Sequence, residues 1–136
     1  MDQILYRSDL AISVEQFINL LQRSTLAERR PVNDRVRIKK MLAYGNILIT
    51  AWHNELLVGV SRALTDFAYC CYLSDLAVDQ AYQHKGIGKE LIRLTHETAG
   101  ENDNTLLLLA APAAAEYYPK IGMDRFTDCF IIKRKN

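Results

Sequence analysis

The spacing of hydrophobic residues changes several times along the chain, and each change predicts an element. Residues 4–7 form a short β-like run. A helix should begin after Ser13, which stands three residues before Gln16 as in a capping box, and should run to about residue 22. Its apolar face consists of Val14, Phe17, Ile18 and Leu21. A second helix should begin after Asp34, a residue type suited to capping a helix.

From Ile47 the pattern becomes that of extended strands. Short polar turns separate three β-rich runs, which predict an antiparallel meander over residues 47–53, 56–64 and 68–78. A helical period then returns, with Ile87, Leu91 and Leu94 on one face and an expected end near Gly100. The middle of the chain therefore predicts a sheet followed by a crossover helix.

The last third of the chain predicts a return to the sheet. Residues 105–109 are a continuous apolar run, which is typical of a buried strand that lies parallel to its neighbour after a helical crossover. Pro112 should start a short helix that runs to Lys120, with Gly122 as its cap. Residues 125–133 should close the chain as one or two strands. The order β-α-α-β-β-β-α-β-α-β predicts a mixed α/β fold.

Length and charge narrow the class of protein. The chain has 136 residues, enough for one substantial core and too few for two ordinary domains, so residues 1–136 should form a single domain. A net charge of +1 gives no electrostatic sign of a nucleic-acid or membrane partner. The first residues lack a basic and apolar leader, and no run approaches the ~20 apolar residues of a membrane span, so we expect a cytoplasmic protein.

The cysteines suggest neither a disulfide framework nor a metal site. Their number is odd, and Cys70, Cys71 and Cys129 show no Cys-x-x-Cys or Cys/His ligand spacing. We expect buried thiols and no bound metal. A reactive Cys71 near the functional site is the alternative.

A glycine-spaced turn between the third β-rich run and the next helix is the strongest candidate for a binding site. The first N–H groups of a helix lack an intrahelical acceptor and lie at the positive end of the helix dipole, so they can bind a phosphate. Gly86 and Gly88 carry no Cβ, which lets a diphosphate approach the backbone. The dinucleotide fingerprint would need glycine at Leu91, and an ATP-type loop would need serine or threonine at Glu90.

The order Gln-x-x-Gly-x-Gly from Gln83 to Gly88 closely resembles motif A of the GNAT superfamily of acetyl-CoA-dependent N-acetyltransferases. Residues 114–123 resemble the later signature of that family, Ala-x-x-Phe-Tyr-x-Lys-x-Gly-Phe, with two departures. Ala111 replaces the customary asparagine, and Met123 replaces the final aromatic residue. The order of elements also matches over essentially the whole chain. The resemblance implies the GNAT fold, a mostly antiparallel sheet splayed at two central parallel strands and flanked by about four helices.

The resemblance also implies acetyl-CoA as co-substrate and assigns residues to it. Its pantetheine arm would pair with the end of the third β-rich run, at Leu76, Ala77 and Val78. Its diphosphate would bind the turn and the start of the helix, at Gln83, His84, Lys85, Gly86, Ile87, Gly88 and Lys89. Tyr118, in the tyrosine position of the later signature, would protonate the departing thiolate, whereas Tyr117 is interpreted as a core aromatic residue.

The base that removes a proton from the amine is less clearly marked. Asp75 is the only carboxylate in an otherwise apolar strand, and such a carboxylate is suited to accept a proton from a cationic amine. Two alternatives stay open. Asp75 can instead be a hydrogen-bonded structural carboxylate that holds a strand bulge or a neighbouring loop, and a water relay can serve as the base.

The acceptor of the acetyl group is expected to meet the first two helices and the loops beside the splay, within residues 24–44 and 65–72. The first of these regions is basic, with Arg29, Arg30, Arg35, Arg37, Lys39 and Lys40. These charges form either a solvated helix face or a contact with an acidic group, on the acceptor or on the coenzyme.

The leading hypothesis is an enzyme that moves an acetyl group from acetyl-CoA to a primary amine of a small molecule, by direct attack in a ternary complex. The alternatives are a protein N-terminal or lysine acetyltransferase and a non-catalytic acyl-CoA-binding sensor. A homodimer is compatible with the sequence.

Overall fold

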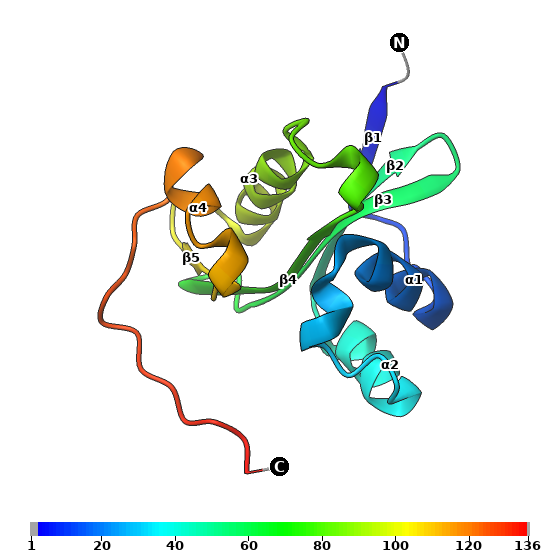
Figure 1. Ribbon diagram of the computed structural model, residues 1–136. Helices are drawn as coiled ribbons and strands as arrows, with labels where there is room; N and C mark the ends of the chain where they lie inside the picture. Colours follow the sequence, from blue (N-terminus) through cyan, green and yellow to red (C-terminus); the bar gives the residue numbers. More distant parts are fainter. Residues whose placement is uncertain (1–2, 136) are drawn as a thin grey trace.

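The computed structural model describes residues 3–135, and Figure 1 shows helices on both faces of a sheet. The strands are β1 (Ile4–Arg7), β2 (Ile47–His53), β3 (Leu56–Thr65), β4 (Cys70–Val78) and β5 (Thr105–Leu107). The α-helices are α1 (Val14–Ser24), α2 (Arg35–Tyr44), α3 (Ile87–Ala99) and α4 (Tyr117–Lys120). Short 3₁₀ turns are η1 (Leu26–Arg29), η2 (Gln80–Tyr82) and η3 (Pro112–Ala114).

The strands follow one another across the sheet in chain order, β1-β2-β3-β4-β5. The pairs from β1 to β4 are antiparallel, as the meander predicted, and β4 and β5 are parallel. The parallel ladder joins only residues 70–72 to residues 105–107, whereas β4 continues to Val78. The remainder of β4 therefore lies beside no strand on its β5 side, and this parting is the predicted splay.

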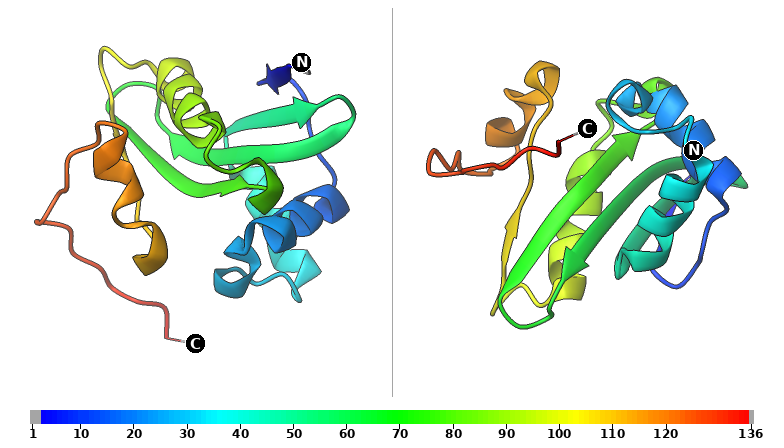
Figure 2. Two further views of the ribbon diagram at one scale, coloured as in Figure 1. Left: turned by 45° about the horizontal axis from the view of Figure 1, so that its top comes forward. Right: turned by 90° about the horizontal axis from the view of Figure 1, so that it is seen from below.

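Helices cover both faces of the sheet and bury a hydrophobic core on each side, as Figure 2 shows from two further directions. The core on the α3 side consists of Ile47, Ile49, Ala51, Val58, Ala63, Cys71, Ile87, Leu91 and Ala99. The core on the α1 and α2 side consists of Phe17, Leu20, Leu21, Ile38, Leu57, Val60 and Ala77. Burial on both faces explains why β3 carries an almost continuous apolar sequence.

The long helices begin and end close to the predicted residues. Ser13 and Gln16 form the capping box of α1: the Gln16 N–H donates to Ser13 Oγ at 3.0 Å, and the Ser13 N–H donates to Gln16 Oε1 at 2.9 Å. Asp34 caps α2 by accepting from the Arg37 N–H at 3.0 Å. The last helix of the core, α3, ends at Gly100, whose φ of 105° is left-handed.

The end of the chain differs from its predicted structure. The predicted strand over 105–109 stops at Leu107, and the predicted helix over 112–120 is divided into η3 and α4. Residues 125–133 form no strand, so the β4/β5 pair lies at one edge of the sheet within the described residues. A β-rich sequence becomes a strand only where a neighbouring strand supplies hydrogen bonds, and propensity alone does not supply them.

The cysteines also differ in part from the prediction. Cys71 is buried in the core, as expected, but Cys70 and Cys129 are exposed. Burial alternates along the start of β4, so Cys70 faces away from the core that holds Cys71, and Cys129 lies in the segment that forms no strand. Both exposures follow from tertiary packing that spacing does not reveal.

Gly59 in β3 lets α3 approach the sheet closely. A Cβ on Gly59 would lie 3.1 Å from Ile87 Cγ2, 3.1 Å from Leu91 Cδ1 and 3.2 Å from the Ala51 Cβ. These atoms are side chains in a packed core, which accommodates added volume only by moving its neighbours. The glycine therefore sets the depth at which the first turn of α3 lies against the sheet.

We expect Gly59→Val to lower the free energy of unfolding by about 1–3 kcal/mol, because the added methyl groups overpack the contact between β3 and α3. Urea unfolding followed by circular dichroism measures this change. The control is Leu56→Val at the exposed start of the same strand, which should have a much smaller effect. Equal effects of the two substitutions would show that the close approach carries no packing constraint.

Candidate functional site

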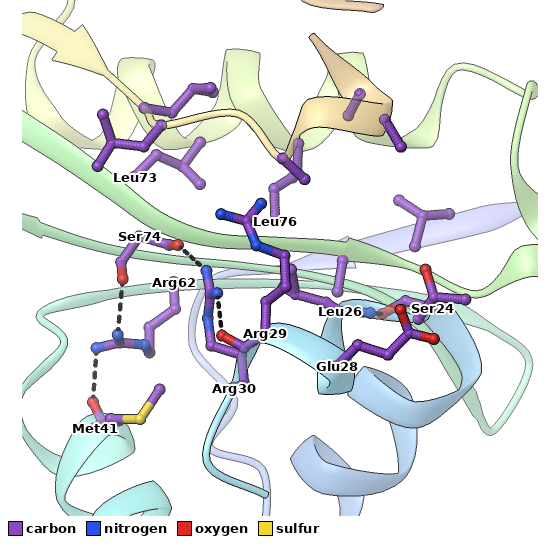
Figure 3. Close-up of a pocket in the computed structure, with 18 of the residues that line it drawn as sticks. Ser24, Leu26, Glu28, Arg29, Arg30, Met41, Arg62, Leu73, Ser74 and Leu76 are labelled. Carbon is purple, nitrogen blue, oxygen red and sulfur yellow. Dashed lines mark hydrogen bonds between the residues drawn. The ribbon is translucent and has the colours of Figure 1, made fainter. Parts of the chain in front are cut away.

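A cleft of about 1250 Å³ opens where β4 parts from β5. We call it the splay cleft. It is lined from one side by β4 and by the segment that follows β5, and from the other by the end of α1, η1, α2 and Arg62 of β3. Figure 3 labels residues of both sides, among them Leu73 and Leu76 of β4 and Leu26 of η1. Segments far apart in the sequence therefore meet along one strand.

The unpaired part of β4 supplies the predicted pantetheine residues to this cleft. Leu76, Ala77 and Val78 all line it. On its other edge, β4 pairs with β3, which fixes the strand in place. An extended ligand along the free edge can use backbone hydrogen bonds as an added strand does.

The predicted diphosphate turn lies at the end of β4 and at the start of α3. Gly86 caps α3 with a left-handed φ of 83°, and the first bond within the helix runs from the Glu90 N–H to the Gly86 carbonyl at 3.1 Å. The side chain of Gln83 lines the splay cleft and donates to the Val78 carbonyl at 3.1 Å, which ties the turn to β4. Gln83 therefore positions the turn as well as lining the cleft.

The other residues of the turn lie outside the lining of the cleft. His84, Lys85 and Lys89 are exposed, whereas Ile87 and Gly88 are buried at the first turn of α3. The Lys85 ammonium stands 5.6 Å above the Tyr82 ring, a cation–π contact. The structure thus forms the helix start that the motif predicted, next to the cleft rather than within its walls.

Tyr117 has a contact that the sequence did not predict. Its hydroxyl oxygen lies 2.9 Å from the position that a Cβ on Gly88 would occupy. Burial raises the pKa of this hydroxyl, and a hydrogen bond with the backbone N–H of Lys89 lowers it by a smaller amount. The interpretation of Tyr117 as a core aromatic residue is therefore wrong: the residue is exposed, and its hydroxyl lies against the first turn of α3. The absence of a side chain on Gly88 is the sequence signal for such a close approach.

Tyr118 lies in the lining of the splay cleft and is partly buried. Its ring contacts that of Tyr117 edge to face, with centroids 5.2 Å apart. Burial, and secondarily the nearby Tyr117, raises the pKa of the Tyr118 hydroxyl above its ordinary value. This group therefore stays protonated at neutral pH, as a proton donor must.

Asp75 is fully buried and does not itself line the cleft, although its neighbours Ser74 and Leu76 do. One of its carboxylate oxygens pairs with Nε of Arg30 and the other with Nε of Arg62. Arg62 stands opposite Asp75 in the β3–β4 register, next to a bulge in the ladder. Because both oxygens already accept from arginines, the arrangement favours the structural alternative for Asp75 over the base.

The two arginines extend this network to the helices, as Figure 3 shows. Arg30 donates to the Ser74 carbonyl at 2.8 Å, and Arg62 donates to the Met41 carbonyl at 2.9 Å and to Ser74 Oγ at 3.1 Å. The network joins η1 and α2 to β3 and β4. Sequence reasoning missed this arrangement, although Arg62 is the one charged residue in apolar β3, as Asp75 is in β4.

The described residues form neither a metal site nor a membrane-spanning helix. No group of three or more His, Cys, Asp or Glu side chains there is arranged to hold a metal ion. Among the helices described, none has the length and apolar character needed to cross a membrane.

Comparison with known proteins identifies the family. Residues 44–122 match the model of the acetyltransferase (GNAT) domain. The chain therefore belongs to the GNAT acetyltransferase family, whose members use acetyl-CoA, and the predicted family and fold class are confirmed.

Individual relatives agree with this assignment. Histone acetyltransferase TAP1 of Glycine max is 33% identical over 69 residues, which are 50% of this chain and 30% of that protein. The chain thus spans less than a third of that relative. A probable acetyltransferase from meticillin-resistant Staphylococcus aureus has a TM-score of 0.78 at 19% identity, covering 97% of this chain and 100% of that one. The aminoglycoside N-acetyltransferase AAC(6')-Iy, in complex with CoA, has a TM-score of 0.76 at 13% identity, and the match covers 100% of this chain and 97% of that one.

We expect Asp75→Asn to lower the free energy of unfolding by about 3–5 kcal/mol, since it leaves two largely buried arginines without their carboxylate. The measurement is urea unfolding at neutral pH. The control is Asp9→Asn, which removes a carboxylate from the exposed Arg7–Asp9 pair and should leave stability nearly unchanged. A stable but inactive Asp75→Asn variant would instead support the role of Asp75 as a base.

Proposed function

We propose that this chain transfers an acetyl group from acetyl-CoA to the primary amine of a small molecule, by direct attack in a ternary complex. The observation that carries this proposal is the parting of β4 from β5, which brings Leu76, Ala77, Val78, Gln83 and Tyr118 into one cleft. Family membership supports the reaction class. The single domain and the homodimer remain predictions.

The residues present fit the coenzyme at both ends of its binding path. The free edge of β4 from Leu76 to Val78 offers backbone groups to the pantetheine amides. The start of α3 offers N–H groups to the diphosphate, and Gly86 leaves open space beside the backbone, whereas the Tyr117 hydroxyl occupies the space beside Gly88. Tyr117 lies at this same helix start, so its hydroxyl is placed to contact the diphosphate or to move aside for it.

The chemistry requires a neutral amine, an acid for the leaving group and a donor for the developing oxyanion. An alkylammonium has a reference pKa of about 10.4, so its proton must be removed before attack on the thioester carbonyl. Because Asp75 is paired with two arginines, we assign this step to a water relay, and we assign Asp75 a positioning role. A backbone N–H of β4 is our candidate oxyanion donor.

Collapse of the tetrahedral intermediate breaks the carbon–sulfur bond and releases a thiolate. Tyr118 lines the cleft and carries a proton at neutral pH, so it can donate that proton to the sulfur. The acetyl group remains on the acceptor nitrogen, and the tyrosine recovers its proton from solvent.

The acceptor end of the cleft supports a compact amine. Arg30 and Arg62, both paired with the buried Asp75, line this side of the cleft together with residues of η1 and α2. A protein acceptor would need an open groove that also holds its peptide backbone. Thiol release, measured with a panel of small amines and of peptides with free N-termini or lysines, decides between the two classes of acceptor.

We expect Gly86→Glu to abolish acetyl-CoA binding, because the new carboxylate would stand at the start of α3, where the diphosphate is proposed to bind. Isothermal titration calorimetry with acetyl-CoA measures the loss. The control is Gly100→Glu at the other end of the same helix. It imposes comparable backbone strain, since Gly86 and Gly100 have φ of 83° and 105° and neither Cβ would meet an atom within 4 Å. Normal binding by Gly86→Glu would exclude this turn as the diphosphate site.

We expect Tyr118→Phe to lower kcat by about 10²–10⁴-fold, the range for loss of a general acid, with little change in acetyl-CoA affinity. Because the pKa of Tyr118 is raised, deprotonation of this residue should not limit activity between pH 6 and about 9. Steady-state thiol release across this pH range tests both points. Tyr44→Phe, on the exposed surface of α2, is the control. An unchanged kcat would rule Tyr118 out as the acid.

A further inference from the structure

The lining of the splay cleft is strongly and asymmetrically charged. Five arginines and a single carboxylate side chain, that of Glu28, belong to its lining. The arginines are Arg29, Arg30, Arg37, Arg62 and Arg134. This local charge contrasts with a formal net charge of only +1 for the whole chain. A nearly neutral protein has therefore concentrated positive charge on one cleft.

The paired arginines Arg30 and Arg62 contribute part of this charge. Asp75 is the one carboxylate that pairs with Arg30 and Arg62, so one positive charge of the network is not neutralised. Arg30 also donates to the Ser74 carbonyl and Arg62 to the Met41 carbonyl, and these hydrogen bonds orient the two guanidinium groups. A fixed positive charge in a partly buried position is screened less by solvent than one on the surface.

The wall of the cleft contributes free donors. The guanidinium groups of Arg29 in η1 and Arg37 in α2 have no side-chain hydrogen bond or ion pair within residues 3–135. Figure 3 shows the Arg29 side chain extending from η1 into the cleft. In contrast, Arg35 on the same helix as Arg37 is paired with Glu15 and lies outside the lining. The unpaired arginines of this region therefore face the cleft.

From this charge arrangement we infer that the acceptor is a primary amine that also carries an anionic group, a carboxylate or a phosphate. This inference rests on the proposed function. A guanidinium binds either anion through two parallel hydrogen bonds, so Arg29 and Arg37 would hold that group while the amine faces the thioester. A polyamine, an aminoglycoside or a lysine-rich peptide would bring further positive charges next to the arginines, and like charges at such a distance oppose binding.

The test compares each anionic amine with its uncharged counterpart. The pairs are L-alanine with ethylamine, γ-aminobutyrate with propylamine, and phosphoethanolamine with ethanolamine, and spermidine represents polycations. We expect kcat/KM to be about ten- to a hundredfold higher for at least one anionic member than for its partner, the range for a charge-assisted hydrogen bond. The carboxylate and phosphate pairs separate the two anions.

Substitution of the two arginines then tests whether the preference for anionic amines comes from the cleft. Arg29→Gln and Arg37→Gln should each reduce the preference about tenfold through KM for the amine, with KM for acetyl-CoA unchanged. Lys39→Gln is the matched control, because it removes one charge from the same helix at an exposed position outside the cleft lining.

Each outcome bears on a different statement. Turnover of amines with no preference for the anionic members, or a preference for spermidine, would overturn the inference and leave the proposed function intact. A rise in KM for acetyl-CoA in the arginine variants, with the amine preference unchanged, would assign the arginines to the coenzyme phosphates and also overturn it. Absence of thiol release with every amine and peptide would instead refute the proposed function itself.

Discussion

The candidate site depends on the early end of the β4/β5 ladder. Hydrogen bonds join the two strands over residues 70–72 and 105–107 only, so the rest of β4 keeps one free edge while β3 holds the other. A free edge inside a folded domain is ordinarily covered, because unpaired backbone groups are costly when buried and prone to pairing when exposed. Here that edge lines a cleft, which makes the backbone itself the binding surface.

A buried charge network holds the opposite wall of this cleft. Asp75 pairs with Arg30 and Arg62, and these arginines reach the backbone of Ser74 and Met41. The pairing therefore fixes η1 and α2 relative to β4. A buried pair contributes little to stability when compared with apolar packing, but removal of one partner is costly, so such a network specifies position more than it adds stability.

The second constraint on the site is the start of α3. Gly59 lets the helix approach the sheet, and Gly86 begins it with a left-handed φ. The Gln83 side chain ties the preceding turn to β4, and Tyr117 and Tyr118 approach from the end of the chain, one toward the helix and one toward the cleft. The two glycines thus allow β3, the start of α3 and the later Tyr117–Tyr118 segment to meet at one place.

The sequence by itself determined the elements and the motifs. Period and capping residues predicted β1, β2, α1 and α2 closely, and the Gln83–Gly88 motif located the helix start, because these features depend on neighbours within a few residues. Tertiary structure alone decided the partners of Asp75, the contact of the Tyr117 hydroxyl with α3 and the lack of a strand over 125–133. Those outcomes depend on which segments meet across the sheet, and no local pattern records the position of a distant arginine or of a pairing strand.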